Sequence, residues 1–168
     1  MKRQYERTSR RLDSGQVDTA LRTAIAAHAQ AHQLGDVLAD AVAGCETRSV
    51  RLSRPGLLAR LTGSGDPDTE HRSVALYTPG YLIIAITGAN RGTHVRSARL
   101  DGVSVGTSAL AAQLGHVDGG DNGVSVTGLW SGETRDAATS FFLGLGADAD
   151  GTAFLTDLRA AITAAKTR

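Results

Sequence analysis

Apolar and polar residues alternate in short segments through the middle of the chain, from about residue 46 to residue 146. Such alternation with period 2 turns one row of side chains to a core and the other to solvent, which is typical of β-strands. Pro79-Gly80 separates two of these segments and is a tight-turn signal, so we expect a hairpin there. The segments expected to form strands are 47–52, 71–78, 81–87, 93–100, 103–105, 123–130 and 140–145.

The two ends of the chain follow other patterns. Residues 14–44 carry apolar residues at helical spacing, with a break at Gly35-Asp36 where Asp36 is placed to cap a second helix. Residues 152–166 have the pattern of an amphipathic C-terminal helix. Its apolar stripe comprises Phe154, Leu155, Leu158, Ala161, Ile162 and Ala165. Residues 1–13 are basic and have no apolar period, so we expect a flexible arm.

The order of these elements limits the fold class. Helices come first, then roughly seven closely spaced short strands, then one helix, which favours an antiparallel barrel or sandwich over alternating β and α units. The chain has 168 residues, of which 41% are hydrophobic, and this suits one domain with an ordinary core. We expect a mainly β, α+β fold with a flexible arm at 1–13, a helical extension at 14–44 and a barrel with its C-terminal helix at 46–168.

Composition bears on the kind of partner and on the cellular compartment. The net charge of +1 does not suggest a nucleic-acid partner. The single cysteine, Cys45, cannot form an internal disulfide, and we expect a half-buried structural residue in a reducing cytosol. Basic residues are almost all Arg, which is typical of GC-rich bacterial coding. No apolar segment follows the basic start, and the longest apolar run, 81–86, is too short to cross a bilayer. A cytoplasmic protein is therefore expected.

One stretch resembles a catalytic motif. Asp148-Ala149-Asp150-Gly151-Thr152 follows an apolar run and resembles the nucleophile loop of the haloacid-dehalogenase phosphatases. In such a loop the first Asp attacks phosphorus, the second is the acid/base, and Mg²⁺ holds the phosphate. The remaining groups come from later strands, yet only residues 153–168 follow here and they are expected to be helical. We interpret the motif as a turn into that helix, capped by Asp150 or Thr152.

Metal and cofactor patterns are weak. His28 and His32 lie four residues apart on a predicted helix, the spacing of two ligands, but no third ligand is evident, so we expect surface histidines. The D-A-D-G stretch does not match an EF-hand, because Gly151 falls at position four and Arg159 at position twelve. We expect no metal, no cofactor and no catalytic residue, and a hydrolase of unrecognised type is the remote alternative.

The predicted loop 54–62, RPGLLARLT, is the most informative segment for binding. Loops are usually polar, yet this one carries Leu57, Leu58 and Leu61 beside Arg54 and Arg60. Three interpretations stay open. The leucines insert at an anionic membrane with the arginines on head-group phosphates, or they dock into a protein partner, or the segment is one helical turn folded back onto the barrel.

The order of elements resembles the pleckstrin-homology (PH) superfold, and in particular the bacterial PH-like domains. The matching pieces are ETRSVRLS, HRSVALYTPGYLIIAIT, THVRSARLDGVSV, GVSVTGLW, SFFLGLG and TAFLTDLRAAITAAK, which together span about residues 46 to 167. The resemblance implies a seven-stranded, partly open antiparallel barrel capped by a C-terminal helix. Such folds commonly act as interaction modules.

The resemblance also implies a site around the first hairpin, where lipid-binding members carry basic residues. The residues in those places are Arg51, Arg54, Arg60 and Arg72. Glu70 and His71 stand where further basic residues would be needed, and Phe154 stands where eukaryotic members usually have Trp. A protein partner is therefore a stronger expectation than an inositol lipid.

These observations together predict a non-enzymatic PH-like module that binds a protein partner, a second copy of itself included. The alternative is peripheral binding to an anionic lipid surface at the inner face of the membrane through the loop 54–62. The residues expected to contact the partner or the membrane are Arg51, Arg54, Leu57, Leu58, Arg60, Leu61 and Arg72.

Overall fold

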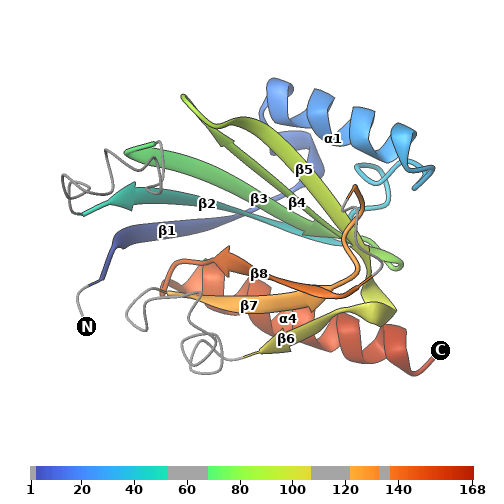
Figure 1. The fold of residues 1–168 in the computed structure, drawn as a ribbon. Coiled ribbons are helices and arrows are strands. Elements are labelled where there is room, and N and C mark those ends of the chain that lie inside the picture. The colour runs from blue at the N-terminus through green and yellow to red at the C-terminus, as the bar shows by residue number, and fades with distance from the viewer. Residues whose placement is uncertain (1–2, 53–67, 107–121, 133–136) are drawn as a thin grey trace.

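The computed structural model describes residues 3–52, 68–106, 122–132 and 137–168 (Figure 1). Within them, eight strands form two antiparallel sheets. The large sheet has the order β1-β2-β3-β4-β5, and its strands are β1 (Tyr5–Leu12), β2 (Ala43–Arg51), β3 (Glu70–Tyr77), β4 (Tyr81–Gly88) and β5 (Gly92–Arg99). The small sheet consists of β6 (Ser104–Gly106), β7 (Gly123–Gly128) and β8 (Thr139–Gly144). The helices are α1 (Thr19–Ala31) and α4 (Ala149–Lys166), with 3-10 turns η1 (Ser14–Gln16) and η2 (Leu100–Gly102).

One face of the large sheet packs against α1 (Figure 1). The helix begins at Asp18, whose carboxylate accepts a hydrogen bond from the amide of Ala20 at 3.0 Å. Leu21 and Ile25 on the helix are 1% and 0% exposed, and they belong to one apolar cluster with Ile83 of β4. Burying such side chains contributes about 1.5–3 kcal/mol each, so this packing fixes α1 on β4 and β5.

The other face of the large sheet packs against the small sheet and α4. Phe154 and Leu158 of α4 are both fully buried, together with Ile84 of β4 and Val126 of β7. Because the side chains of a strand alternate between faces, the large sheet supplies one row of residues to each core. The molecule therefore has two hydrophobic cores that share one sheet.

Most of the predicted elements are confirmed. Each of the seven predicted strands corresponds to one strand from β2 to β8. The β3–β4 hairpin turns at Pro79-Gly80, where the hydroxyl of Thr78 accepts hydrogen bonds from the amides of Gly80 and Tyr81. The C-terminal helix is confirmed with a start at Ala149, three residues earlier than expected, and its buried face includes Phe154, Leu158 and Ile162.

The prediction of a flexible arm at residues 1–13 is wrong for residues 5–12. They form β1, which pairs with β2 along its length in antiparallel register, Tyr5 opposite Arg51 and Leu12 opposite Gly44. Only Tyr5, Ser9 and Leu12 of this strand are buried. The strand is stabilised by its neighbours rather than by its own apolar content.

The prediction of a helical extension over residues 14–44 is only partly correct. The break at Gly35 is confirmed, since Gly35 has a φ of 80° and α1 has already ended at Ala31. No second helix follows within these described residues. Asp36 instead closes a turn, with its carboxylate accepting from the amide of Ala39 at 3.0 Å and its carbonyl accepting from the amide of Asp40 at 2.9 Å. Val37 is 2% exposed and fills the α1 core from this turn.

The described strands do not close into one barrel, and the large sheet has an edge at β1 and another at β5. Contacts from other segments cover part of each edge. At β5, Ser97 donates its amide to the hydroxyl of Ser131 at 2.9 Å and accepts from the amide of Ser131 at 2.8 Å. At β1, the cover comes from the start of α4. Covering an edge in this way satisfies backbone groups that would otherwise be open to pairing with another chain.

Candidate functional site

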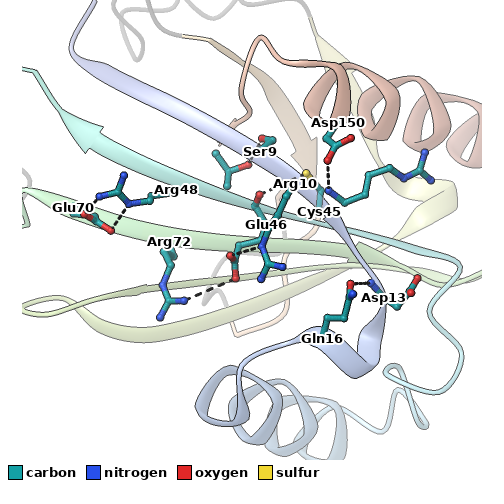
Figure 2. A network of polar contacts seen from close by, with 12 residues as sticks. Ser9, Arg10, Asp13, Gln16, Cys45, Glu46, Arg48, Glu70, Arg72 and Asp150 are labelled. Atoms are coloured by element: carbon teal, nitrogen blue, oxygen red, sulfur yellow. Dashed lines mark hydrogen bonds and ion pairs between the residues drawn. The ribbon is translucent and has the colours of Figure 1, made fainter.

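The stretch D-A-D-G-T at 148–152 joins the small sheet to α4 and also covers the edge of β1. Asp148 is the N-cap of α4, and its Oδ1 accepts from the amide of Gly151 at 2.8 Å. Its Oδ2 accepts from the amide of Ser9 at 2.7 Å, and Asp150 Oδ2 accepts from the amide of Arg11 at 3.0 Å. Figure 2 shows Asp150 directed at the backbone of β1. The prediction of Asp150 or Thr152 as the cap is therefore wrong. Both carboxylates are engaged by backbone amides, as in a structural junction.

Cys45 lies beneath this junction in the inner row of β2 and is 1% exposed. Beside it the hydroxyls of Ser9 and Thr47 hydrogen-bond to each other at 2.7 Å, and the Ser9 hydroxyl also accepts from the amide of Gly146. Burial raises the pKa of the Cys45 thiol, and a neutral thiol is a poor nucleophile. The cysteine is fully buried, more deeply than the half-buried residue that was expected.

His28 connects α1 to β5 and to the segment that follows β7. Its Nε2 lies 2.9 Å from the hydroxyl of Ser97 and 3.0 Å from that of Ser131. Its ring centroid lies 4.4 Å from that of His32. Burial, and secondly the charge of His32, lower the pKa of His28 below its ordinary value. His28 is thus a half-buried connecting residue and not a surface histidine, and among the described residues no group of three metal-ligand side chains occurs.

The two predicted site residues that the structure describes, Arg51 and Arg72, lie on opposite faces of the large sheet. Arg72 shares its face with Glu46, and its Nη1 lies 4.0 Å from Glu46 Oε2. Figure 2 shows Glu46 between Arg72 and Arg10, and the Nε of Arg10 lies 3.1 Å from Glu46 Oε1. On the same face Arg48 and Glu70 form a second ion pair with a shortest distance of 2.6 Å. This face is a charge-compensated surface, and Arg72 is part of it.

Arg51 lies on the face that turns to the small sheet, at the end of β2. Its Nη2 donates to the hydroxyl of Tyr5 at 3.3 Å. The structure therefore does not bring Arg51 and Arg72 into one site. The other predicted site residues, Arg54, Leu57, Leu58, Arg60 and Leu61, lie outside the described residues.

The segment that leads back from the predicted loop into β3 is held by Asp68. This carboxylate is 1% exposed and accepts from the amides of Asn90 at 2.7 Å and Arg91 at 3.2 Å. The Nε of Arg91 donates to it as well, at 3.1 Å. Burial alone would raise the pKa of Asp68, but these hydrogen bonds outweigh burial and hold the pKa below its ordinary value. Asp68 therefore fixes the chain against the β4–β5 hairpin in its ionised form.

The structure also shows a grooved surface with exposed apolar residues around the C-terminal half of α4, which the sequence did not reveal. Two grooves flank the helix there, with volumes of about 410 Å³ and 620 Å³, and Arg168 lines both. Val42 lies in the smaller groove and is 60% exposed, whereas Leu129 lies in the larger groove and is 62% exposed. We call these two grooves and the alanine-rich ridge between them the α4 surface. Val42 and Leu129 are single apolar residues far apart in the sequence, so no sequence pattern predicted the α4 surface.

The larger groove of the α4 surface has a mixed polar rim. Arg99 and Asp101 pair with each other there at 2.7 Å. Lys166 also lines this groove, and its Nζ donates to the hydroxyl of Ser104 at 3.4 Å. The groove therefore combines an exposed leucine with the cationic side chains of Lys166 and Arg168.

Comparison of the chain with protein-family models, with curated proteins and with solved structures found no match. Of the helices in the described part of the chain, none is both long and apolar enough to cross a membrane.

Proposed function

We propose that this chain is a non-enzymatic interaction module that binds a protein partner through the α4 surface. The observation that carries the proposal is the position of Val42 and Leu129. They are two of the three large apolar side chains that stand out as exposed among the described residues, and each lies in a groove beside the same helix. Exposed apolar residues gathered on one surface are typical of binding sites.

The chemistry of the α4 surface suggests what kind of partner it binds. Burying a Val and a Leu on association contributes about 1.5–3 kcal/mol each, and the small alanine side chains of α4 let a partner backbone approach the helix. Lys166 and Arg168 at the larger groove suit acidic side chains next to the apolar anchor. The partner would therefore present one or two apolar side chains flanked by Asp or Glu, and a second copy of this chain is one such candidate.

The PH-like assignment belongs to this proposal. It is supported by the order of strands from β2 to β8 and by α4, which packs against the inner face of the sheets. β1 and α1 are additions to that pattern. The α4 surface lies at the end of the molecule where β3 ends, and none of the described residues that line it belongs to the predicted loop 54–62. The two candidate binding surfaces can therefore be tested separately.

The test compares two pairs of substitutions in tagged protein used as bait in extracts of the source cells. Val42→Asp with Leu129→Asp should reduce the recovery of specific partners at least tenfold, because charge is placed in both grooves. Leu57→Asp with Leu58→Asp should leave recovery unchanged. Circular dichroism checks that both variants remain folded, which is expected because Val42 and Leu129 are mostly exposed.

The other outcomes of this test are informative. Loss of partners in the Leu57 and Leu58 variant alone would place the binding site on the loop, contrary to the proposal. Unchanged recovery in both variants would contradict binding through either surface. Self-association is measured by light scattering over a concentration series, where the Val42 and Leu129 variant should be monomeric if the partner is a second copy. Salt-sensitive co-sedimentation with anionic vesicles, lost in the loop variant, would favour the membrane alternative.

A further inference from the structure

A small cavity lies between the large and small sheets, where β2 ends and β3 begins. Its volume is about 50 Å³. It is lined on the large sheet by Arg7 of β1, Ser49 of β2, and His71 and Ser73 of β3. On the small sheet it is lined by residues of β8 that include Phe142 and Gly144.

The polar lining of this cavity departs from the pattern of the surrounding core. In the inner row of β3, the buried Ala75 and Tyr77 pack in the core, whereas Ser73 and His71 line the cavity. Ser49 and Ser73 are 1% and 7% exposed, so their hydroxyls are buried between two sheets. Burying hydroxyl groups costs free energy unless they form hydrogen bonds. The cavity is therefore suited to a ligand that accepts hydrogen bonds.

The guanidinium of Arg7 is fixed at the edge of the cavity by aromatic rings. Its Cζ lies 4.9 Å from the ring centroid of Tyr5 and 5.2 Å from that of Phe142. Its Nη1 donates to the carbonyl of Asn122 at 3.2 Å. A Cβ at position 144 would lie 2.5 Å from Arg7 Nε, so the glycine there leaves the space that Arg7 occupies. The side chain is thus held in one position between the two sheets.

From these contacts we propose that the cavity binds a phosphate-sized oxyanion. Arg7, Ser49, His71 and Ser73 supply hydrogen-bond donors from three neighbouring strands, and none of the described residues that line the cavity is acidic. A guanidinium matches the geometry of phosphate oxygens. A single water needs about 10–15 Å³ of such a cavity, so a volume of about 50 Å³ accommodates a phosphate or carboxylate group and excludes a sugar or a base.

The ligand would enter by this anionic group and leave the rest of its structure outside. Arg7, His71 and Phe142 are only half-buried, so the cavity opens to the surface on their side. Arg51 lies next to the entrance, since its Nη2 donates to the hydroxyl of Tyr5, the ring on which Arg7 stacks. It adds a second cation near the path of an anion.

The experiment measures binding of inorganic phosphate to the full chain by isothermal titration and by thermal unfolding, against chloride at equal ionic strength. Phosphate should bind and raise the unfolding temperature, whereas chloride should not. Arg7→Met keeps an apolar side chain between the two rings and should weaken phosphate binding at least tenfold. The double variant Ser49→Ala with Ser73→Ala removes only two hydroxyls and should weaken it as well. Arg72→Met, on the opposite face of the same sheet, is the matched control and should bind like the wild type.

The proposal is overturned if phosphate has no effect beyond that of chloride, which would indicate a cavity filled by water. It is also overturned if Arg7→Met and Arg72→Met weaken binding equally, which would indicate nonspecific attraction to arginine. If Arg7→Met does not fold, the variant Ser49→Ala with Ser73→Ala tests the proposal in its place, and unchanged phosphate binding in that variant would overturn it.

A second experiment uses vesicles that contain phosphatidic acid and asks whether the phosphate belongs to a lipid. Co-sedimentation that free phosphate displaces places the phosphate on a lipid, and binding of free phosphate alone places it on a small molecule. Both results support the cavity as the site.

This inference does not depend on the proposed function. The cavity lies where β3 begins, and the α4 surface lies where β3 ends. Phosphate binding with no protein partner, or a protein partner with no phosphate binding, would separate the two proposals.

Discussion

Replacing Asp148 by Asn should lower the free energy of unfolding, because it removes the hydrogen bond between Asp148 and the Ser9 amide at the outer edge of β1. Asn is as good an N-cap as Asp, so the hydrogen bond from the amide of Gly151 should survive. The second carboxylate oxygen becomes an NH₂ group, which cannot accept from the amide of Ser9. A hydrogen bond to a charged group contributes about 1.5–3 kcal/mol. Because this contact is only partly buried, we expect a loss of about 2 kcal/mol in the free energy of unfolding.

A matched control separates this loss from the effect of charge at a helix start. Asp18 caps α1 through one exposed hydrogen bond to the amide of Ala20. Asp18→Asn keeps a cap and removes a charge near the helix dipole, which is worth about 0.3–1 kcal/mol. The difference between Asp148→Asn and Asp18→Asn therefore measures the contact with β1.

The assay is urea unfolding at neutral pH followed by circular dichroism, with hydrogen exchange at the amide of Ser9. For a domain of this size, about 2 kcal/mol corresponds to about 4–8 °C in the unfolding temperature. The Ser9 amide should exchange faster in the Asp148 variant and at the wild-type rate in the Asp18 variant. Equal stability of the two variants, with unchanged exchange at Ser9, would refute the account of how β1 is held.

Three further predictions concern single sites. Burial, and secondly the charge of His32 at the C-cap of α1, lower the pKa of His28 from its ordinary value of 6.5, so the unfolded chain takes up the proton first and stability falls as the pH drops below about 6.5. This pH dependence of the urea midpoint should flatten in His28→Gln, and an unchanged pH dependence in that variant would contradict the role of His28. Gly44→Ala places a Cβ 2.9 Å from a backbone oxygen of β1 and should cost about 1–3 kcal/mol. Gly15→Ala meets no atom within 4 Å and should change urea stability by less than about 0.5 kcal/mol. Burial raises the pKa of the Cys45 thiol, so a thiol reagent should modify it only after unfolding, and rapid reaction of the native protein would contradict its burial.

The strands from β2 to β8 and the helix α4 could be predicted from the sequence because each has its own apolar period. β1 could not. Its outer edge is satisfied by Asp148 and Asp150, which lie 139 residues further along the chain from the amides of Ser9 and Arg11 that they bind. The mainly polar residues of β1 therefore form a strand because residues far along the chain bind its backbone, and a local sequence pattern does not show such contacts.

The D-A-D-G-T stretch was correctly interpreted as a junction, but its second role at the edge of β1 depends on the same long-range contacts. The candidate sites were harder still to predict. Val42 and Leu129 are single apolar residues in unrelated segments, and only folding brings them to the two sides of α4. Arg7 was assigned to a flexible arm, although it lines the inter-sheet cavity with Ser49 and His71. Of the predicted basic residues, Arg51 lies near this cavity, whereas Arg72 turns to the other face.

The central claim is that the α4 surface is where a protein partner binds. Site-specific photo-crosslinking in the source cells tests it most directly, with a photoreactive amino acid placed at position 42, 129 or 58 in turn. The account predicts that one partner is cross-linked from positions 42 and 129 and not from position 58. Cross-links to a partner from position 58, with none from positions 42 and 129, would contradict it.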